Sequence, residues 1–363
     1  MRSTIRIMML AAFATLALGQ TTAWAQKTGY TAFRLAVSGA VSTEVTDLND
    51  SSNVVGNFYD ANHFPTGFFY QHASKTYVTL GAGANALGMN QNNQIVGFDN
   101  VWNVGRYWDS PTAASIPLMP LPGHTHSKAH EINNTGIIIG TSYIPEDEPL
   151  TPGFRAAVVW CVNEQGVVTG PVPLPFPAGH LIGVPRQLTE SLDGVTTIVG
   201  DTKESVSTPE HAVQWSVGVD NAGVPYVVSG PIILSSAYAY GSGINHAKDV
   251  VGAAVFAENS SQWPYLKRNG QSVTKLPGIS KATYGLAFSI NNAGQIVGYQ
   301  GYISRGYITN RAVLWTSPTA VVDLNSMVKL GAGESLTRSW RINNRGDILA
   351  YTNTDVPCLL IAK

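Results

Sequence analysis

One nine-residue phrase recurs along the chain and limits its possible folds more than any other feature. Its clearest copy, residues 290–298, reads Ile-Asn-Asn-Ala-Gly-Gln-Ile-Val-Gly. In each copy an apolar residue precedes an Asn-x-x-Gly turn, and a β-branched pair follows. Because Asn and Gly tolerate the positive φ of a tight turn, we interpret each copy as a β-hairpin. The copies are anchored at Asn49, Asn90, Asn133, Thr189, Asn245, Asn291 and Asn343.

The spacing of the copies predicts the architecture. A second glycine ends each phrase, with Ala350 in its place in the last copy, and these positions recur on average about every 49 residues. A period near 40 to 50 residues with strand signals only is typical of one propeller blade per repeat. We therefore predict an all-β fold, a seven-bladed β-propeller of four-stranded antiparallel blades. It would form a single domain over residues 26–363.

The residues before each anchor predict the innermost strand of each blade. Positions four and six before the anchor, such as Ala287 and Gly285, are small or β-branched in the six repeats with an Asn anchor. Blades crowd together near the axis, where only small side chains fit between them. The apolar residue directly before the anchor, such as Ile290, should face the other neighbouring blade because side chains alternate along a strand. A large ring such as Trp315 should end the third strand and cover the blade face.

The two ends of the mature chain are complementary. Residues 357–362 resemble a third strand that no fourth strand follows, and residues 30–37 resemble a fourth strand that no third precedes. Pairing of these N- and C-terminal strands would close the ring and remove open sheet edges.

Residues 1–25 have the features of a secretory signal peptide. Arg2 and Arg6 precede an apolar run over residues 7–18, and Ala23-Trp24-Ala25 is a small-x-small cleavage site. No later stretch has the roughly 20 apolar residues of a membrane span. We therefore expect a secreted or periplasmic monomer without a membrane span.

The net charge of the mature chain limits the classes of partner that it could bind. Without residues 1–25, the chain has 20 basic and 23 acidic residues, which argues against a nucleic-acid-binding protein.

The two cysteines, Cys161 and Cys358, lie in the third and seventh repeats. A ring would hold them farther apart than the roughly 7 Å that a disulfide bridges, so we expect two free, buried thiols.

The repeats resemble those of the extracellular HAF-repeat family of bacterial proteins, named for a His-Ala-Phe triplet. The best matches are residues 290–298 with Arg311-Ala312-Val313-Leu314-Trp315, and the triplet His211-Ala212-Val213. The resemblance covers nearly all of the mature chain, although no literal His-Ala-Phe occurs. It implies an exported bacterial β-propeller and no particular chemistry.

Few motifs suggest chemistry. His124-Thr125-His126 with His130 has the alternation of a metal-binding strand, and Glu146-Asp147-Glu148 is an acidic run. We interpret the first as a polar loop with one satisfied histidine and the second as a solvated loop. No Gly-x-Ser-x-Gly elbow occurs. We therefore predict no catalytic residue, no metal and no cofactor.

The loops that lead into the innermost strands should gather on one face of the ring, around the axial opening. Aromatic and cationic groups there suit a sugar or an anionic polymer. The predicted ligand-binding residues are His126, Arg186, Tyr240, Tyr284 and Arg338. Acidic residues are few on this face, namely Glu131, Glu190 and Glu334, so a paired-carboxylate hydrolase is not indicated.

Three functions remain open. The first is a non-catalytic exported propeller that binds a polysaccharide or a cell-surface protein through the axial-face loops. The second is a polysaccharide-acting lyase or hydrolase, which clustering of the five residues in one pocket would favour and their dispersal would disfavour. The third is a structural envelope protein.

Overall fold

The computed structural model describes residues 29–145, 155–235, 238–257, 260–304 and 306–363. The predicted signal peptide and the acidic run at residues 146–148 lie outside these ranges. Within them the chain is all-β, apart from the short 3₁₀ helix η1 (Leu324–Ser326). No described helix is long and apolar enough to cross a membrane.

The described strands form six sheets, of which five have four strands and one has eight. Three of the four-stranded sheets are β2 (Ser42–Leu48), β3 (Val54–Tyr59), β4 (Pro65–Gln71), β5 (Thr76–Ala82); β6 (Ala84–Met89), β7 (Ile95–Asp99), β8 (Val104–Trp108), β9 (Ile116–Leu118); and β18 (Ala239–Ile244), β19 (Val250–Ala254), β20 (Trp263–Lys267), β21 (Val273–Lys275). The other two are β22 (Tyr284–Ile290), β23 (Ile296–Ser304), β24 (Tyr307–Ser317), β25 (Ala320–Asp323); and β26 (Leu336–Ile342), β27 (Ile348–Thr352), β28 (Pro357–Ala362), β1 (Tyr30–Arg34).

The eight-stranded sheet consists of two antiparallel groups of four strands. They are β10 (His126–Ile132), β11 (Ile137–Tyr143), β12 (Arg155–Val162), β13 (Val168–Pro173); and β14 (Ile182–Leu188), β15 (Thr196–Lys203), β16 (His211–Val219), β17 (Pro225–Ile233). The two groups meet at one parallel pair, Arg155 with Ile182.

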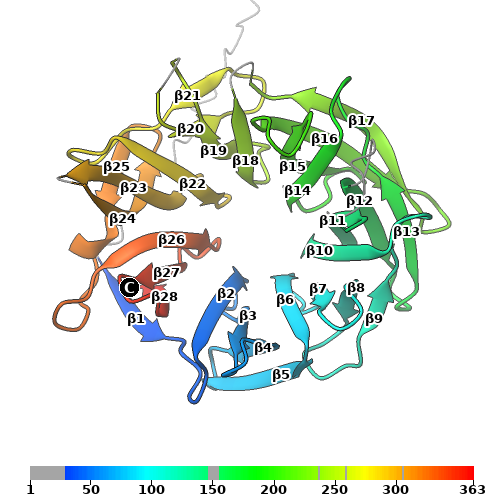
Figure 1. Cartoon of the computed structure of the whole chain (residues 1–363), viewed down its shortest axis with the longest axis horizontal. Coiled ribbons are helices and arrows are strands. Elements are labelled where there is room, and N and C mark those ends of the chain that lie inside the picture. Colours follow the sequence, from blue (N-terminus) through cyan, green and yellow to red (C-terminus); the bar gives the residue numbers. More distant parts are fainter. Residues whose placement is uncertain (1–28, 146–154, 236–237, 258–259, 305) are drawn as a thin grey trace, which may run out of the picture.

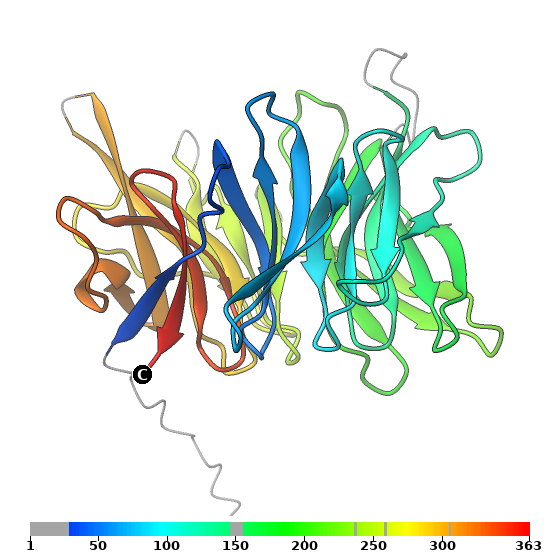
Figure 2. The ribbon, with the colours of Figure 1, turned by 90° about the horizontal axis from the view of Figure 1, so that it is seen from below.

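The sheets stand side by side around a common axis, which gives a propeller-like fold (Figure 1). Figure 2 shows the same ring from the side, with loops at both of its faces. The strands nearest the axis, called inner strands below, are β2, β6, β10, β14, β18, β22 and β26. Their small residues, such as Ala129 and Ala287, are completely buried, as predicted. The core therefore lies between neighbouring sheets, where Trp160, Trp215 and Trp315 are also fully buried.

The first and last described strands pair with each other. β1 runs antiparallel to β28, from Tyr30 opposite Ala362 to Arg34 opposite Cys358. The predicted pairing of the two terminal strands is thus present, and it joins residues more than 300 positions apart in one sheet.

The turns use their asparagines differently from our interpretation. Positive φ falls three residues after the anchor, as at Gly294 (74°) and Gly346 (84°), and not on the anchor itself. The anchor side chain instead accepts backbone hydrogen bonds. Asn343 Oδ1 accepts from the N–H groups of Arg345 at 3.0 Å and Asp347 at 2.8 Å. Each of the six turns with an Asn anchor is therefore an Asx turn closed by a residue in the left-handed region.

The anchors also link neighbouring sheets. Asn291 Nδ2 donates to the carbonyl oxygen of Asn343 at 3.0 Å, and Asn343 Nδ2 donates to that of Asn49 at 3.0 Å. The same bond to the next anchor is made by Asn49, Asn90, Asn133 and Asn245. Thr189 lacks an amide donor, so its turn does not continue the chain of bonds.

One packing prediction is wrong. The apolar residue before the anchor does not face the opposite neighbour from the small residues: Ile290 packs with Ala287 against Val251 of the preceding sheet. The reason is an extra residue, Phe288, between the paired residues Ala287 and Ser289. A β-bulge of this kind inverts the alternation of side chains beyond it.

Both cysteines are free and buried, as predicted. Burial raises the pKa of the Cys161 thiol, and it raises that of Cys358 to about 11.

Candidate functional site

Every inner strand carries a bulge at the same position, three residues before its anchor. In β2, for example, Val45 and Asp47 both pair with β3 while Thr46 between them is skipped. The skipped residues are Thr46, Leu87, His130, Arg186, Ser242, Phe288 and Trp340. Because a bulge re-aims its side chain, these residues point away from the sheet faces and line one cavity on the axis.

The second glycine of the repeated phrase pairs with the residue just before the bulge in six of the seven inner strands. A Cβ added at Gly298 would lie 2.0 Å from the carbonyl oxygen of Leu286 on the inner strand. Glycine thus lets the two backbones approach closely beside the bulge. Where Ala350 replaces it, β26 has an additional irregularity between Leu336 and Arg338.

The cavity, called the axial cavity below, has a volume of about 330 Å³. It is lined by the seven skipped residues together with Pro185, Tyr240 and Arg341. Phe288 and Trp340 lie on adjacent strands with ring centroids 4.5 Å apart, tilted by 52°. The Trp340 indole is fixed because its Nε1 donates to the carbonyl oxygen of Thr46 at 3.1 Å. The wall therefore offers a rigid aromatic corner.

Arg186 lines the cavity with two of its five N–H donors already engaged. Its Nε and Nη2 donate to Asp201 Oδ1 and Oδ2 at 3.1 and 2.9 Å. Burial raises the pKa of Asp201, and the guanidinium opposes that rise. The Asp201 carboxylate in turn raises the pKa of Arg186. The pair is a bidentate ion pair of two opposite charges, of which the arginine end faces the cavity.

Two further titratable side chains, His130 and Tyr240, line the cavity, and neither forms an ion pair with a carboxylate. His130 Nδ1 lies 2.9 Å from the carbonyl oxygen of Pro185, and Nε2 lies 3.3 Å from Thr141 Oγ1. Burial lowers the pKa of His130 to about 4. Burial also raises the pKa of Tyr240. Near neutral pH the imidazole is therefore uncharged, with both nitrogens engaged, and the phenol keeps its proton.

A buried charged layer borders the cavity on the side of the Asn turns. Arg341 Nε lies 3.4 Å from Asp47 Oδ1, and its Nη2 lies 3.4 Å from Glu131 Oε2. Burial raises the pKa of Glu131 well above its usual value, and both the charge of Asp47 and the hydrogen bond that Glu131 donates to it add to this rise. Burial also raises the pKa of Asp47, but the Arg341 guanidinium and the hydrogen bond with Glu131 oppose that rise. Glu131 is therefore the protonated partner. Gly88, on the strand between them, leaves room for this contact, because a Cβ there would lie 2.9 Å from Glu131 Oε1.

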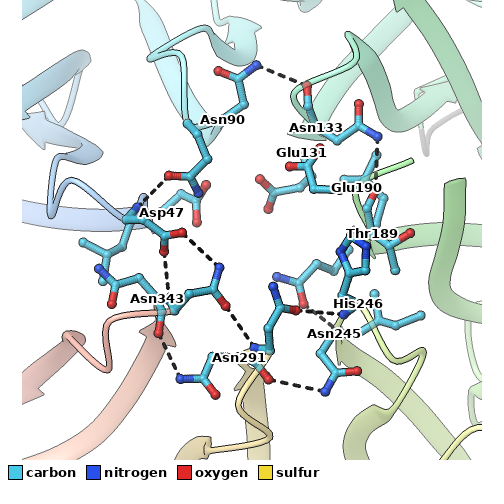
Figure 3. A pocket seen from close by; sticks show the side chains of 18 of the residues that line it. Asp47, Asn90, Glu131, Asn133, Thr189, Glu190, Asn245, His246, Asn291 and Asn343 are labelled. Carbon is cyan, nitrogen blue, oxygen red and sulfur yellow. Dashed lines mark hydrogen bonds between the residues drawn. The ribbon is translucent and has the colours of Figure 1, made fainter. Parts of the chain in front are cut away.

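A second, smaller cavity of about 140 Å³ lies among the Asn turns, beyond the charged layer (Figure 3). Its polar wall includes every anchor except Asn49, together with Asp47, Glu131, Glu190 and His246, and it shares no lining residue with the axial cavity. Glu190 accepts a hydrogen bond from the Asn134 N–H at 2.9 Å, and burial raises its pKa.

Two of the five predicted ligand-binding residues, Arg186 and Tyr240, line the axial cavity. The other three have partners elsewhere. The His126 ring lies 5.1 Å from the Tyr143 ring, the Tyr284 hydroxyl donates to Asn310 at 2.7 Å, and Arg338 donates to Asp355 at 2.9 Å. The five residues therefore do not form one site.

Two interpretations of acidic residues are corrected. Glu131 and Glu190 were expected beside the loops that enter the inner strands, but they lie toward the Asn turns, near the end of β10 and after β14. A carboxyl pair was not expected, yet Asp47 and Glu131 form one. The signal was available, because both residues stand two positions before an anchor. The carboxyl pair was not predicted because β2 and β10, which carry Asp47 and Glu131, are far apart in the chain and approach each other only at the axis.

The histidine cluster separates in space. His124 Nδ1 contacts Ser142 Oγ at 2.8 Å, while His126 and His130 have the partners given above. Among the described residues no group of three or more His, Cys, Asp or Glu side chains is arranged to hold a metal ion.

No protein-family model matches the chain, and neither does any curated protein at a significant level. Solved structures do match. The uncomplexed acylaminoacyl peptidase of Pyrococcus horikoshii is 9% identical with a TM-score of 0.55, over 89% of this chain and 52% of that one. A mutant puromycin hydrolase is 12% identical with a TM-score of 0.53, over 85% of this chain and 49% of that one. The chain thus spans about half the length of these proteins, and at such low identity the likeness concerns the fold alone.

Proposed function

We propose that the chain is an exported seven-bladed β-propeller related to the extracellular HAF-repeat proteins. Counting the eight-stranded sheet as two blades gives seven four-stranded units, one for each anchor. The pairing of β1 with β28 and the Asn343 to Asn49 hydrogen bond support closure of the ring. Export is tested by the mass of the secreted protein, which should begin at Gln26.

We propose further that the protein is a non-catalytic binding protein that holds a glycan in the axial cavity. The observation that carries this proposal is the aromatic corner of Phe288 and Trp340 in a cavity of about 330 Å³, near the lower end of the range of small-molecule sites. Rigid rings of this kind pack against the apolar face of a sugar.

The chemistry of the wall favours binding over catalysis. A general base needs a pKa near the working pH and a free acceptor atom. His130 has neither, because burial lowers its pKa to about 4 and both of its nitrogens are engaged. The polysaccharide lyase or hydrolase remains the second candidate, which the same experiment tests.

The test uses the mature protein, residues 26–363, with a panel of neutral and uronate polysaccharides. Retention on each polymer and release of new chain ends are both measured. We expect retention without release. Tyr240→Phe, which removes a hydroxyl from the cavity wall, should weaken retention about tenfold, the equivalent of about 1.4 kcal/mol. Its matched control is Tyr284→Phe, because the Tyr284 hydroxyl already donates to Asn310 and Tyr284 does not line the cavity.

Either of two results would contradict the proposal. Release of chain ends that disappears in Tyr240→Phe would make the protein an enzyme. Equal weakening by Tyr240→Phe and Tyr284→Phe would remove the axial cavity as the site.

A further inference from the structure

We infer that the axial cavity takes an uncharged pyranose ring, and excludes a uronate or other anionic sugar. This inference rests on the proposed glycan-binding function and names the class of sugar that the same cavity would hold. It reverses the expectation that the arginines at the axis attract an anionic polymer.

Arg186 offers a ligand carboxylate no uncompensated positive charge. Two of its five N–H donors are held by Asp201 at 2.9 and 3.1 Å, and the Asp201 side chain is only 4% exposed. A ligand carboxylate would have to displace that buried group or bind beside it. Displacement would leave Asp201 charged and unpaired in the interior, which is strongly unfavourable.

Arg341, the other cation of the cavity wall, is balanced in the same way. It lies 3.4 Å from both Asp47 and Glu131, and these two carboxyl groups hold one proton between them. One positive and one negative charge remain. With His130 uncharged, the charges on the described wall and the groups that contact it cancel, so an anion entering the cavity loses hydration without gaining a free counter-charge.

The polar groups that remain for a ligand are neutral. The Tyr240 and Ser242 hydroxyls line the cavity and have no hydrogen-bond partner among the described residues. Each hydroxyl can donate one hydrogen bond and also accept hydrogen bonds, which matches the hydroxyl groups of a sugar ring. The Phe288 and Trp340 rings, on neighbouring strands, provide the apolar surface for the face of that ring. Two hydroxyls and an aromatic corner are together complementary to a neutral polyhydroxylated ring.

The experiment compares neutral and uronate oligosaccharides of equal length, titrated into the mature protein by calorimetry. We expect affinity for the neutral series to exceed that for the uronate series about tenfold or more, the equivalent of one buried charge left without a partner. Affinity for the neutral series should change less than about twofold between 0.05 and 0.5 M salt (about 14 to 4 Å of screening length), because no ligand charge is screened.

A variant that should gain affinity for uronates provides the most direct test. Asp201→Asn releases the Arg186 fork and leaves one uncompensated positive charge in the cavity. Uronate affinity should then rise about tenfold and become salt-dependent. Because Asp201 is buried, the double variant Arg186→Gln with Asp201→Asn, which removes both charges, is measured beside it as a control for stability. The double variant should keep the preference for neutral rings.

The outcomes separate the two proposals. Stronger binding of uronates than of neutral sugars by the unmodified protein, or loss of the neutral preference in the double variant, would overturn this inference and leave glycan binding intact. Absence of binding by both series would instead overturn the proposed function.

Discussion

The side chain of Asn343 donates a hydrogen bond to the backbone carbonyl oxygen of Asn49 at 3.0 Å, across 294 residues of sequence. The backbone N–H of Asn344 likewise donates to the carboxylate of Asp50 at 2.8 Å. The last repeat thus contacts the first through the same bond that joins consecutive repeats. The Asn of the phrase has two functions, closing its own turn and holding the next one.

Removal of an anchor amide should therefore cost more than removal of an ordinary turn asparagine. Asn343→Ala leaves the N–H groups of Arg345 and Asp347 without their acceptor, and it removes one of the two hydrogen bonds to the Asn49 carbonyl oxygen, which also accepts from the Ser52 N–H. We therefore expect a loss of about 2–3 kcal/mol in the free energy of unfolding. Asn163 is the control, since it caps an Asx turn through Gln165 and Val167 but is exposed and bonds to no neighbouring turn. Asn163→Ala should cost about 1 kcal/mol or less by urea denaturation. Equal costs would mean that the link between turns adds nothing.

The glycine that accommodates the bulge should not accept a methyl group. In Gly298→Ala the new Cβ would lie 2.0 Å from the Leu286 carbonyl oxygen, so one of the two backbones must move. We expect a loss of about 3 kcal/mol or more. The equivalent position of the last repeat is already alanine, and Ala350→Gly should change stability by about 1 kcal/mol or less. The urea concentrations at which the Gly298→Ala and Ala350→Gly variants are half unfolded test this expectation. A Gly298→Ala variant as stable as the unmodified protein would contradict it.

Glu131 should make the protein less stable as the pH rises. Its pKa in the folded state is raised above the usual value of 4.5, so the folded state retains a proton that the unfolded chain releases. Stability therefore falls with pH from about 4.5 up to the folded-state pKa, with a slope of at most about 1.4 kcal/mol per pH unit. Glu131→Gln mimics the protonated form and should become more stable relative to the unmodified protein over that window. Glu44→Gln, at an exposed position of β2, is the control. A stability difference between Glu131→Gln and the unmodified protein that does not change with pH would show that Glu131 is ionised when folded.

Deletion of residues 357–363 should prevent folding to a soluble state. β28 lies between β27 and β1, so its loss removes a buried strand and leaves two unpaired edges. We expect aggregation on expression, measured as the soluble fraction and by size-exclusion chromatography. Deletion of Lys363 alone, which follows β28, is the control and should leave the protein soluble. A soluble, folded product of the longer deletion would mean that the two terminal strands are not needed together.

Much of the architecture could be read from the sequence because it repeats. The phrase around Asn291, the small residues at Ala287 and Gly285 and the buried Trp315 each recur at fixed offsets. Local turn chemistry and crowding near the axis have the same physical cause in every copy. The pairing of the terminal strands was predicted from the same repeat pattern. Residues 357–362 resemble the third strand of a repeat with no fourth strand after it, and residues 30–37 resemble a fourth strand with no third before it.

The axial cavity could not be read in this way. Strict alternation predicted that Ile290 faces away from Ala287, but the bulge at Phe288 returns it to the same side. A single extra residue in β22 thus changes the direction of every side chain after it, and period-two reasoning cannot detect it. The skipped residue of each strand is the one that enters the cavity.

The repeated hairpin, the small residues of the inner strands and the complementary terminal strands were all predictable from the amino-acid sequence, because each follows from a local pattern of residues. The side chains that meet on the axis, in contrast, became known only from the arrangement of the sheets. Arg186 meets Asp201, and Asp47 meets Glu131 and Arg341, through contacts between strands. Burial and pairing then fix which of these groups carry charge. The charge of the cavity, and with it the class of ligand, is therefore a property of the assembled sheets.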